Sequence, residues 1–595
     1  MKYIIGAYSQ LPPGSSAEEY EALLAGQLKP LLTTVYRNSD CMLLFRLGIS
    51  AFEYFEQNHP EINMLINDLC RKGQMEILTS SYYDAVLSLI PTHERPSQIE
   101  KTTTFIRKNF SRRPRGLWLY NQVFNPSFVP LVSLSGLDYL VISTYNQTGY
   151  TVEQTRPFYT AEMGRASLVF PVDDRFSSLV HDLYHGGLSN EKFISEMTKR
   201  CRESSGALTT IMLNLDQMMG TPGSSDVFGA LYGIAGKNCT LPGIYLQENE
   251  ITKTQYLSNG IYGRDFNIGK ASSINQLIYD SPMLSRNYAL VNMLKEVEKD
   301  NKKNLDDRKN LENLLMKASS SSLYFPDECR IPSVMRYSNR YACEVETILA
   351  KMPNCILPEE RDLDFDRCEE FIIPGRSSIA HLSRKGAVLS SFTVMSSFFD
   401  TAFHSGEGLF ADSFTDDRTS RVTRLSAKTY EVTPLDRRRS DFFAKAPEIL
   451  LGKKPVGLTK RYKFRQSTVV VEIEIENLSN EPISGFTYTS TVNLAFPVRC
   501  TAVCPEGEIP EGKSVLTQSI GVSDRNCPFS ISLVFGCECF VQKEDFTRNT
   551  HTWLGDKSYY EYTQFKIQKK LTLDPGATDR LTIGFRTEKR KGETQ

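Results

Sequence analysis

The stretch Gly116-Leu-Trp-Leu-Tyr-Asn-Gln-Val-Phe-Asn-Pro126 decides the fold of this chain. It reads as an apolar strand that ends in a polar cluster, and it is followed by an amphipathic run to Gly136 and a second strand at 138–143. An α/β barrel presents its reactive groups at strand ends in this way, and a proline favours the start of the next helix. The stretch therefore predicts a barrel strand with functional side chains around residue 121.

The same alternation of strand and helix runs through residues 1–280. Apolar runs with the length of buried strands occur at 2–8, 41–47, 74–78, 138–143, 167–170, 209–215 and 243–246. Strands that alternate with helices indicate a parallel sheet with helices outside it, and the length suits a barrel. An open doubly wound sheet is the alternative, but the chain has no Gly-x-Gly-x-x-Gly turn for a dinucleotide.

Two further domains are expected after the barrel. Residues 281–362 carry apolar side chains at three- and four-residue spacing, which predicts a small helical bundle. From 363 to 588 the period changes to two, as in Val469-Val-Val-Glu-Ile-Glu-Ile-Glu476, which predicts an antiparallel β-sandwich. The tail at 589–595 is expected to be disordered.

Composition excludes several classes of function. A net charge of -1 leaves no basic surface for nucleic acid. No run approaches the ~18 apolar residues of a membrane span, and no secretory core follows Met1, so a cytoplasmic protein is expected. The 13 cysteines are scattered, and neither Cys500/Cys504 nor Cys537/Cys539 has the usual zinc spacing or a nearby histidine. We expect no metal and no cofactor.

The strand around Trp118 resembles the nucleophile motif of glycoside hydrolase family 57, the α-amylases and 4-α-glucanotransferases. The framework positions of that motif are Gly116, Trp118, Leu119, Val123 and Pro126. Weaker similarities occur in the family's order at 73–78, 80–84, 89–91, 112–116, 459–464, 476–477 and 492–496. The resemblance implies a (β/α)7-type incomplete TIM barrel, a helical domain and a C-terminal sandwich, in a protein of α-glucan metabolism. It also implies substrate-binding roles for Gln10, Glu76, Tyr82, Tyr83 and Trp118.

The resemblance stops at the catalytic carboxylates. Retaining α-glucan enzymes need two carboxyl groups about 5–5.5 Å apart. The family's nucleophile position holds Asn121, whose amide is too weak a nucleophile to form a glycosyl ester. Aligned on Gly220, the family's acid/base position holds Leu215. The resemblance thus describes a member that lacks both catalytic groups.

Three aspartates are candidate replacements: Asp84, Asp174 and Asp216. Asp84 and Asp174 follow strands, where acids also serve as caps and turn formers. Asp216 is one residue from the acid/base position. A slip of one residue turns a side chain to the opposite face of a strand, so Asp216 reaches the barrel mouth only if the strand ends before it.

Three hypotheses remain at this point. The first is a catalytically degenerate amylase-like protein that binds an α-glucan, such as a maltooligosaccharide, or a protein partner. The second is an active α-glucan hydrolase or glucanotransferase with relocated carboxylates. The third is a scaffold without a sugar site, its mouth closed by Leu215, Met218 and Met219. The carboxyl groups and the open space around Asn121 distinguish them.

Overall fold

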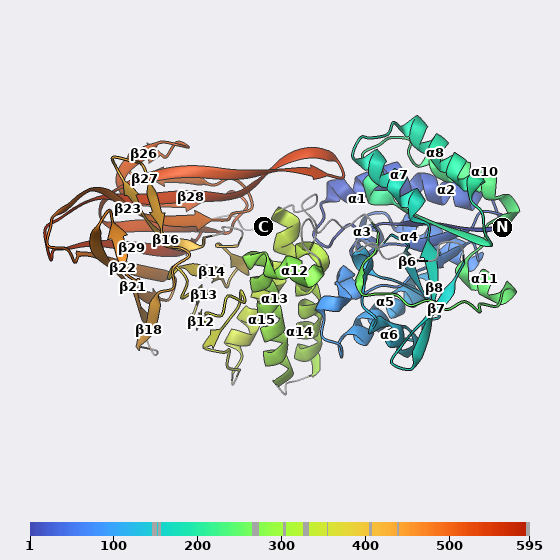
Figure 1. Ribbon diagram of the computed structural model, residues 1–595, viewed down its shortest axis with the longest axis horizontal. Helices are drawn as coiled ribbons and strands as arrows, with labels where there is room; N and C mark the ends of the chain where they lie inside the picture. Colours follow the sequence, from blue (N-terminus) through green and yellow to red (C-terminus); the bar gives the residue numbers. More distant parts are fainter. Residues whose placement is uncertain are drawn as a thin grey trace. The chain divides into compact units, whose positions relative to one another are not determined.

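The computed structural model of the chain describes residues 1–145, 152, 156–263, 273–300, 305–324, 332–353, 355–403, 407–436 and 440–590. These residues form two compact units. The first unit consists of 1–280, 319–338 and 550–557, and the second of 281–318, 339–549 and 558–595. Figure 1 shows the α/β elements of the first unit and the antiparallel strands of the second.

Two sheets of mainly parallel strands form the centre of the first unit. The first sheet has the order β3 (Met75–Ile77), β2 (Leu43–Arg46), β1 (Lys2–Tyr8), β9 (Leu208–Asn214). The second has the order β4 (Gly116–Trp118), β6 (Tyr139–Ser143), β8 (Arg165–Val172), with β7 (Phe158–Glu162) antiparallel at its edge. All the other pairings in both sheets are parallel.

Main-chain hydrogen bonds connect the two sheets on both sides. Thr79 follows β3 and exchanges hydrogen bonds with β4, from its own N to Gly116 O at 2.9 Å and from Trp118 N to its O at 2.8 Å. On the other side, Asp173 N donates to Thr210 O of β9 at 2.9 Å. The carboxyl ends of these strands therefore face the same side of the unit.

Helices cover the outside of these strands (Figure 1). Among them are α2 (Lys29–Arg37), α4 (Pro60–Arg71), α5 (Arg95–Phe110), α7 (Asp174–Tyr184), α8 (Asn190–Glu203) and α10 (Asp226–Ala235). Residues 243–246, expected as a strand, lie in helix α11 (Pro242–Glu248). A short apolar run does not distinguish a buried strand from a helix, and Pro242 occupies the first helical position, which proline favours.

The second unit combines helices with a large antiparallel sheet. Helices α13 (Pro282–Asp300), α14 (Leu305–Ala318) and the part of α15 (Pro332–Lys351) from residue 339 share a core with Ile372 of β12 (Glu370–Pro374) and Ile379 of β13 (Ser378–Leu382). Among the described residues, the sheet runs in connected pairings from β11 (Glu360–Arg361) to β29 (Thr578–Lys589).

The end of the chain is ordered further than the sequence indicated. Lys589 was expected in a disordered tail, but it belongs to β29 and pairs with Phe529. Arg590 N donates to Pro528 O at 3.1 Å. These backbone bonds hold residues 589 and 590 against the neighbouring strand. Residues 591–595 lie outside the described part of the chain.

No helix in the described ranges has both the length and the apolar character that crossing a membrane requires.

Candidate functional site

A group of polar side chains lies at the carboxyl ends of β1, β4 and β9. Gln10, which follows β1, connects the ends of β4 and β9. Its backbone N donates to Asp216 Oδ2 at 2.5 Å, and its side-chain Oε1 accepts from Asn121 N at 3.0 Å. Trp118 Nε1 lies 3.4 Å from the same oxygen. Asn121 and Asp216 are therefore neighbours across Gln10, although they are 95 residues apart in the sequence.

Asn121 occupies a tight turn after β4. Its φ of 51° and the φ of 52° at Gln122 lie in the left-handed region, which asparagine tolerates better than most residues. The side chain is 2% exposed, and its Nδ2 has no hydrogen-bond partner among the described residues. The position that the resemblance aligned with the family's nucleophile thus presents a neutral, buried amide.

Asp216 points toward the segment that follows β1, because β9 has already ended. Asn214 is the last residue of the strand and caps helix α9 (Leu215–Met218) by accepting from Asp216 N at 2.9 Å. Asp216 Oδ1 then accepts from Ser9 Oγ at 2.6 Å. Because the strand ends before Asp216, the one-residue slip does not turn this carboxylate away from the polar residues after β1. Leu215 is fully buried, so the polar group at this strand end is Asp216.

Asp84 is paired with Arg46, and both side chains are fully buried. Arg46 Nη2 donates to Asp84 Oδ1, and Arg46 Nη1 donates to Ser9 O. Burial raises the pKa of Asp84, whereas the charge of Arg46 opposes that rise. The ion pair fixes the end of β2 to the segment after β3, and the hydrogen bond to Ser9 O fixes it to the segment after β1. Both contacts have a structural role.

Asp174 lies beside Asn121 in a small cavity. Its Oδ1 accepts from Ser143 Oγ at 3.0 Å, and its backbone N donates to Thr144 Oγ1 at 3.2 Å. The cavity is about 20 Å³ in volume, and Gln10, Trp118 and Asn121 also line it. A cavity of this size holds about one water molecule and is far smaller than a pocket for a sugar ring.

The aromatic residues to which the resemblance gave substrate-binding roles are buried. Trp118 is 2% exposed, and its ring packs on that of Tyr8 at a centroid distance of 4.5 Å. Tyr82 and Tyr83 are also buried, and Lys101 Nζ lies 4.4 Å from the centre of the Tyr82 ring. These rings belong to the core of the unit and offer no open platform for a sugar.

Glu76 does not join the cluster at the strand ends. Its carboxylate accepts from Tyr139 OH at 2.5 Å and from Gly243 N at 3.1 Å. Tyr139 opens β6, and Gly243 lies in α11, so Glu76 faces the amino-terminal side of the strands. Burial raises its pKa. Its position differs from the one that the resemblance implied for a substrate-binding residue.

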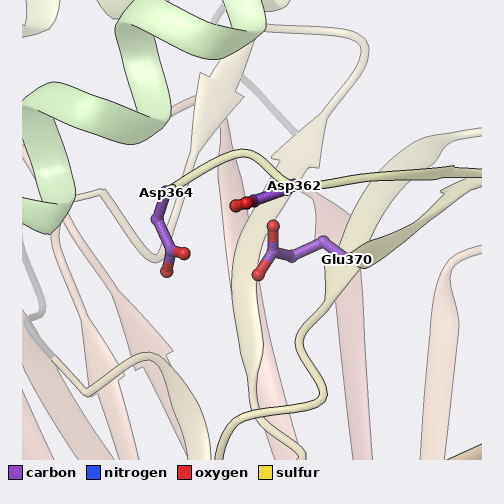
Figure 2. A group of neighbouring side chains, drawn as sticks. All are labelled: Asp362, Asp364 and Glu370. Atoms are coloured by element: carbon purple, nitrogen blue, oxygen red, sulfur yellow. The ribbon is translucent and has the colours of Figure 1, made fainter. Parts of the chain in front are cut away.

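A second group of carboxylates lies in the second unit and was missed from the sequence. Ligand oxygens of Asp362, Asp364 and Glu370 all lie within 4.8 Å of one another (Figure 2). The signal was present as alternate aspartates at 362, 364 and 366. Arg286 Nη2 lies 3.8 Å from Asp364, and Lys385 Nζ lies 3.2 Å from Asp366. Nearby cations therefore balance part of this negative charge.

Glu370 is expected to make the protein less stable as pH rises. Burial and the charge of Asp364 raise its pKa from 4.5 to about 7. The folded state therefore holds a proton that the unfolded state releases, and stability falls between about pH 4.5 and 7 by roughly 3 kcal/mol. Glu370→Gln should flatten this slope and raise the free energy of unfolding at pH 8 by about 1–3 kcal/mol, measured by urea unfolding followed by circular dichroism.

The exposed neighbour Glu369 provides the matched control. Glu369→Gln should change the unfolding free energy by less than about 0.5 kcal/mol at every pH. A wild-type stability that does not fall from pH 5 to 7, or a slope that Glu370→Gln leaves unchanged, would contradict the assignment.

Comparison with known proteins relates this chain to one family. Residues 13–230 match the family model described as glycosyl hydrolase family 57. The chain is related to this family. It is 28% identical over 183 residues to a 4-alpha-glucanotransferase of Thermococcus kodakarensis and 27% identical over 183 residues to an alpha-amylase of Pyrococcus horikoshii. Each alignment covers 30% of this chain, and they span 28% and 29% of those relatives.

The likeness in fold extends further than the likeness in sequence. The structure of the 4-alpha-glucanotransferase from Thermococcus litoralis superposes on 98% of this chain and 99% of its own, with a TM-score of 0.81 at 14% identity. At 14% identity, this agreement establishes a shared fold and does not establish a shared activity. An α/β unit with parallel strands followed by a large antiparallel sheet is therefore an arrangement that a family 57 relative shares.

Proposed function

We propose that this protein is a catalytically degenerate relative of the family 57 amylases and glucanotransferases, which acts in α-glucan metabolism by binding a glucan or a protein partner. Its two sheets would correspond to the (β/α)7 barrel of the family. The observation that carries the proposal is the buried amide of Asn121 at the end of β4, in the position of the family's nucleophile.

The chemistry of retaining transfer argues for lost catalysis. The nucleophile must attack the anomeric carbon and form a glycosyl ester, which an amide oxygen does not do efficiently. A neutral side chain also supplies no negative charge to stabilise a cationic sugar. The cavity of about 20 Å³ beside Asn121 leaves no space for a glucose unit in this arrangement.

The three candidate replacement carboxylates already have partners. Asp84 is paired with Arg46, Asp174 accepts from Ser143, and Asp216 accepts from Ser9 and Gln10. Charge-assisted hydrogen bonds and an ion pair hold these carboxylates fixed in place. These contacts support structural roles for all three.

An active transferase with a relocated carboxylate is the second candidate, and Asp216 is the residue that favours it. Its carboxylate lies at the correct strand end and shares Gln10 with Asn121. The same position suits a general acid, but catalysis would still need a second carboxyl group as nucleophile. The third candidate, a scaffold without a sugar site, is favoured by the burial of Leu215, Met218 and Met219.

Incubation with maltoheptaose tests the proposal, with product lengths resolved by chromatography. We expect no hydrolysis or transfer above the enzyme-free blank, because general acid–base catalysis alone accounts for about 10²–10⁴-fold in rate and the covalent step is also absent.

A further inference from the structure

A polar groove of about 580 Å³ lies on one face of the antiparallel sheet in the second unit. Five adjacent strands form it: β17 (Val422–Arg424), β16 (Leu409–Asp416), β23 (Ile483–Leu494), β28 (Gly555–Leu573) and β27 (Phe529–Thr552). Figure 1 shows β16, β23, β27 and β28 together in the second unit. The volume falls within the range of about 300–1,000 Å³ that is typical of ligand pockets.

Hydroxyl groups form the floor of the groove. Thr489 and Thr491 alternate along β23 and line it, although the two residues are only 4% and 7% exposed. Ser413 of β16 pairs with Thr489 and lines the groove beside it. Among the described residues no hydrogen bond to either threonine hydroxyl is found, and neither oxygen is among the fully buried unpaired atoms, so both oxygens are open to the groove. Polar groups in a mostly buried position are normally paired, so these two hydroxyls are available to a ligand in the groove.

Amide groups continue the polar lining on β28. Gln564 Nε2 donates to Asn493 Oδ1 at 3.0 Å, which orients both side chains along the groove. Gln568 follows on the same face, opposite Thr489. An amide offers donors and an acceptor together, and this combination matches the hydroxyl groups of a sugar.

The charges in the groove largely compensate one another. Lys566 Nζ donates to Glu544 Oε2 at 2.9 Å, and both side chains line the groove. The other charged lining residues are Glu407, Arg424 and Asp412; the first two have opposite signs, and Asp412 is paired with the buried Lys460 at 2.7 Å. Such a balance does not favour a phosphate, a nucleic acid or an acidic peptide, which need an excess of positive charge. A neutral ligand rich in hydroxyl groups fits best.

Two stacked aromatic rings add an apolar surface. The rings of Phe546 on β27 and Tyr562 on β28 lie 4.6 Å apart at 12°, and both line the groove. Ligand sites combine such surfaces with a few placed polar groups. The face over β22 (Thr468–Asn477) and β29 differs from the groove, because it carries solvated charged pairs. One of these pairs is Arg580 Nε with Glu474 Oε1 at 2.8 Å.

We propose that this groove binds a neutral oligosaccharide, with the hydroxyls of Thr489 and Thr491 hydrogen-bonded to the sugar and the Phe546–Tyr562 pair beside a ring face. The choice of an α-linked glucan rests on the proposed function. The groove would give the protein a glucan site in the second unit. The small cavity beside Asn121, in the first unit, offers no such site.

Calorimetry of the full-length protein with maltoheptaose tests the groove. The wild type should release heat of binding, and Thr489→Val/Thr491→Val should weaken the affinity by about tenfold or more, because two buried hydrogen bonds to the ligand are lost without a change of shape. Thr459→Val, on β21 (Lys454–Arg465) outside the groove, is the matched control and should bind as the wild type does.

Two further variants, and an analysis of the sugar lengths after incubation, make the outcome decisive. Tyr562→Ala, which removes half of the aromatic pair, should also weaken binding and serves if the double valine variant fails to fold. Asp174→Asn, in the first unit, should leave binding unchanged. Each of three results would overturn this inference. The first is no heat of binding with the wild type, the second is unchanged affinity in both folded groove variants, and the third is a loss of binding in Asp174→Asn alone. Shortened or lengthened sugar in the same mixture would instead overturn the proposed loss of catalysis.

Discussion

Asp84→Ala is expected to lower the free energy of unfolding by about 3–5 kcal/mol. The substitution leaves the guanidinium of Arg46 fully buried without its counter-charge. Removing one member of a buried pair is costly for this reason, whatever the net worth of the intact pair. Chemical unfolding followed by tryptophan fluorescence measures the effect, because both tryptophans, Trp118 and Trp553, lie in the first unit.

A double substitution and a surface pair provide the controls. Arg46→Met/Asp84→Leu removes both charges and should cost less than Asp84→Ala alone. Arg115 Nε lies 2.5 Å from Asp138 Oδ2, and both side chains are more than a third exposed, so Asp138→Ala should cost less than about 1 kcal/mol. If Asp84→Ala is as mild as Asp138→Ala, Asp84 is not structural and becomes available for catalysis.

Trp118→Ala is expected to destabilise the first unit by about 3–5 kcal/mol. The indole is buried against Tyr8, and truncation leaves a cavity that the surrounding strands fill only in part. Unfolding followed by the fluorescence of Trp553 measures the loss.

Trp118→Phe and Tyr36→Ala complete this comparison. The phenylalanine keeps most of the ring and should cost less than the alanine. Tyr36 is 44% exposed, so its truncation should change stability by less than about 0.5 kcal/mol. A stable Trp118→Ala variant that loses maltoheptaose binding would show instead that this ring is a sugar platform.

The fold could be predicted from the sequence because its signals are long and repetitive. Parallel strands such as β1 and β6 are largely apolar, and alternation at 469–476 marks a strand of the large sheet, β22. Element boundaries were harder. Ser15-Ser-Ala-Glu18 and Ser16-Ala-Glu-Glu19 both fit a capping box, and the structure uses Ser16, whose side chain accepts from Glu19 N at 3.2 Å. Either serine satisfies the pattern, and only the backbone conformation selects one.

The site depended on details that a sequence does not carry. Asp216 reaches Ser9 because β9 ends at Asn214, and nothing in the residue types fixed that end. Glu76 seemed placed by its motif, yet its partners Tyr139 and Gly243 hold it on the other side of the strands. The groove at Thr489 and Thr491 was invisible because its residues come from strands that are distant in sequence.

Product analysis of maltoheptaose incubated with the wild type and with Asp216→Asn tests the central claim most directly. Loss of the nucleophile at Asn121 predicts that the heptasaccharide stays intact with both proteins, at the level of the enzyme-free blank. Shorter or longer glucans that form with the wild type and disappear with Asp216→Asn would contradict the account and show that Asp216 serves a working active site.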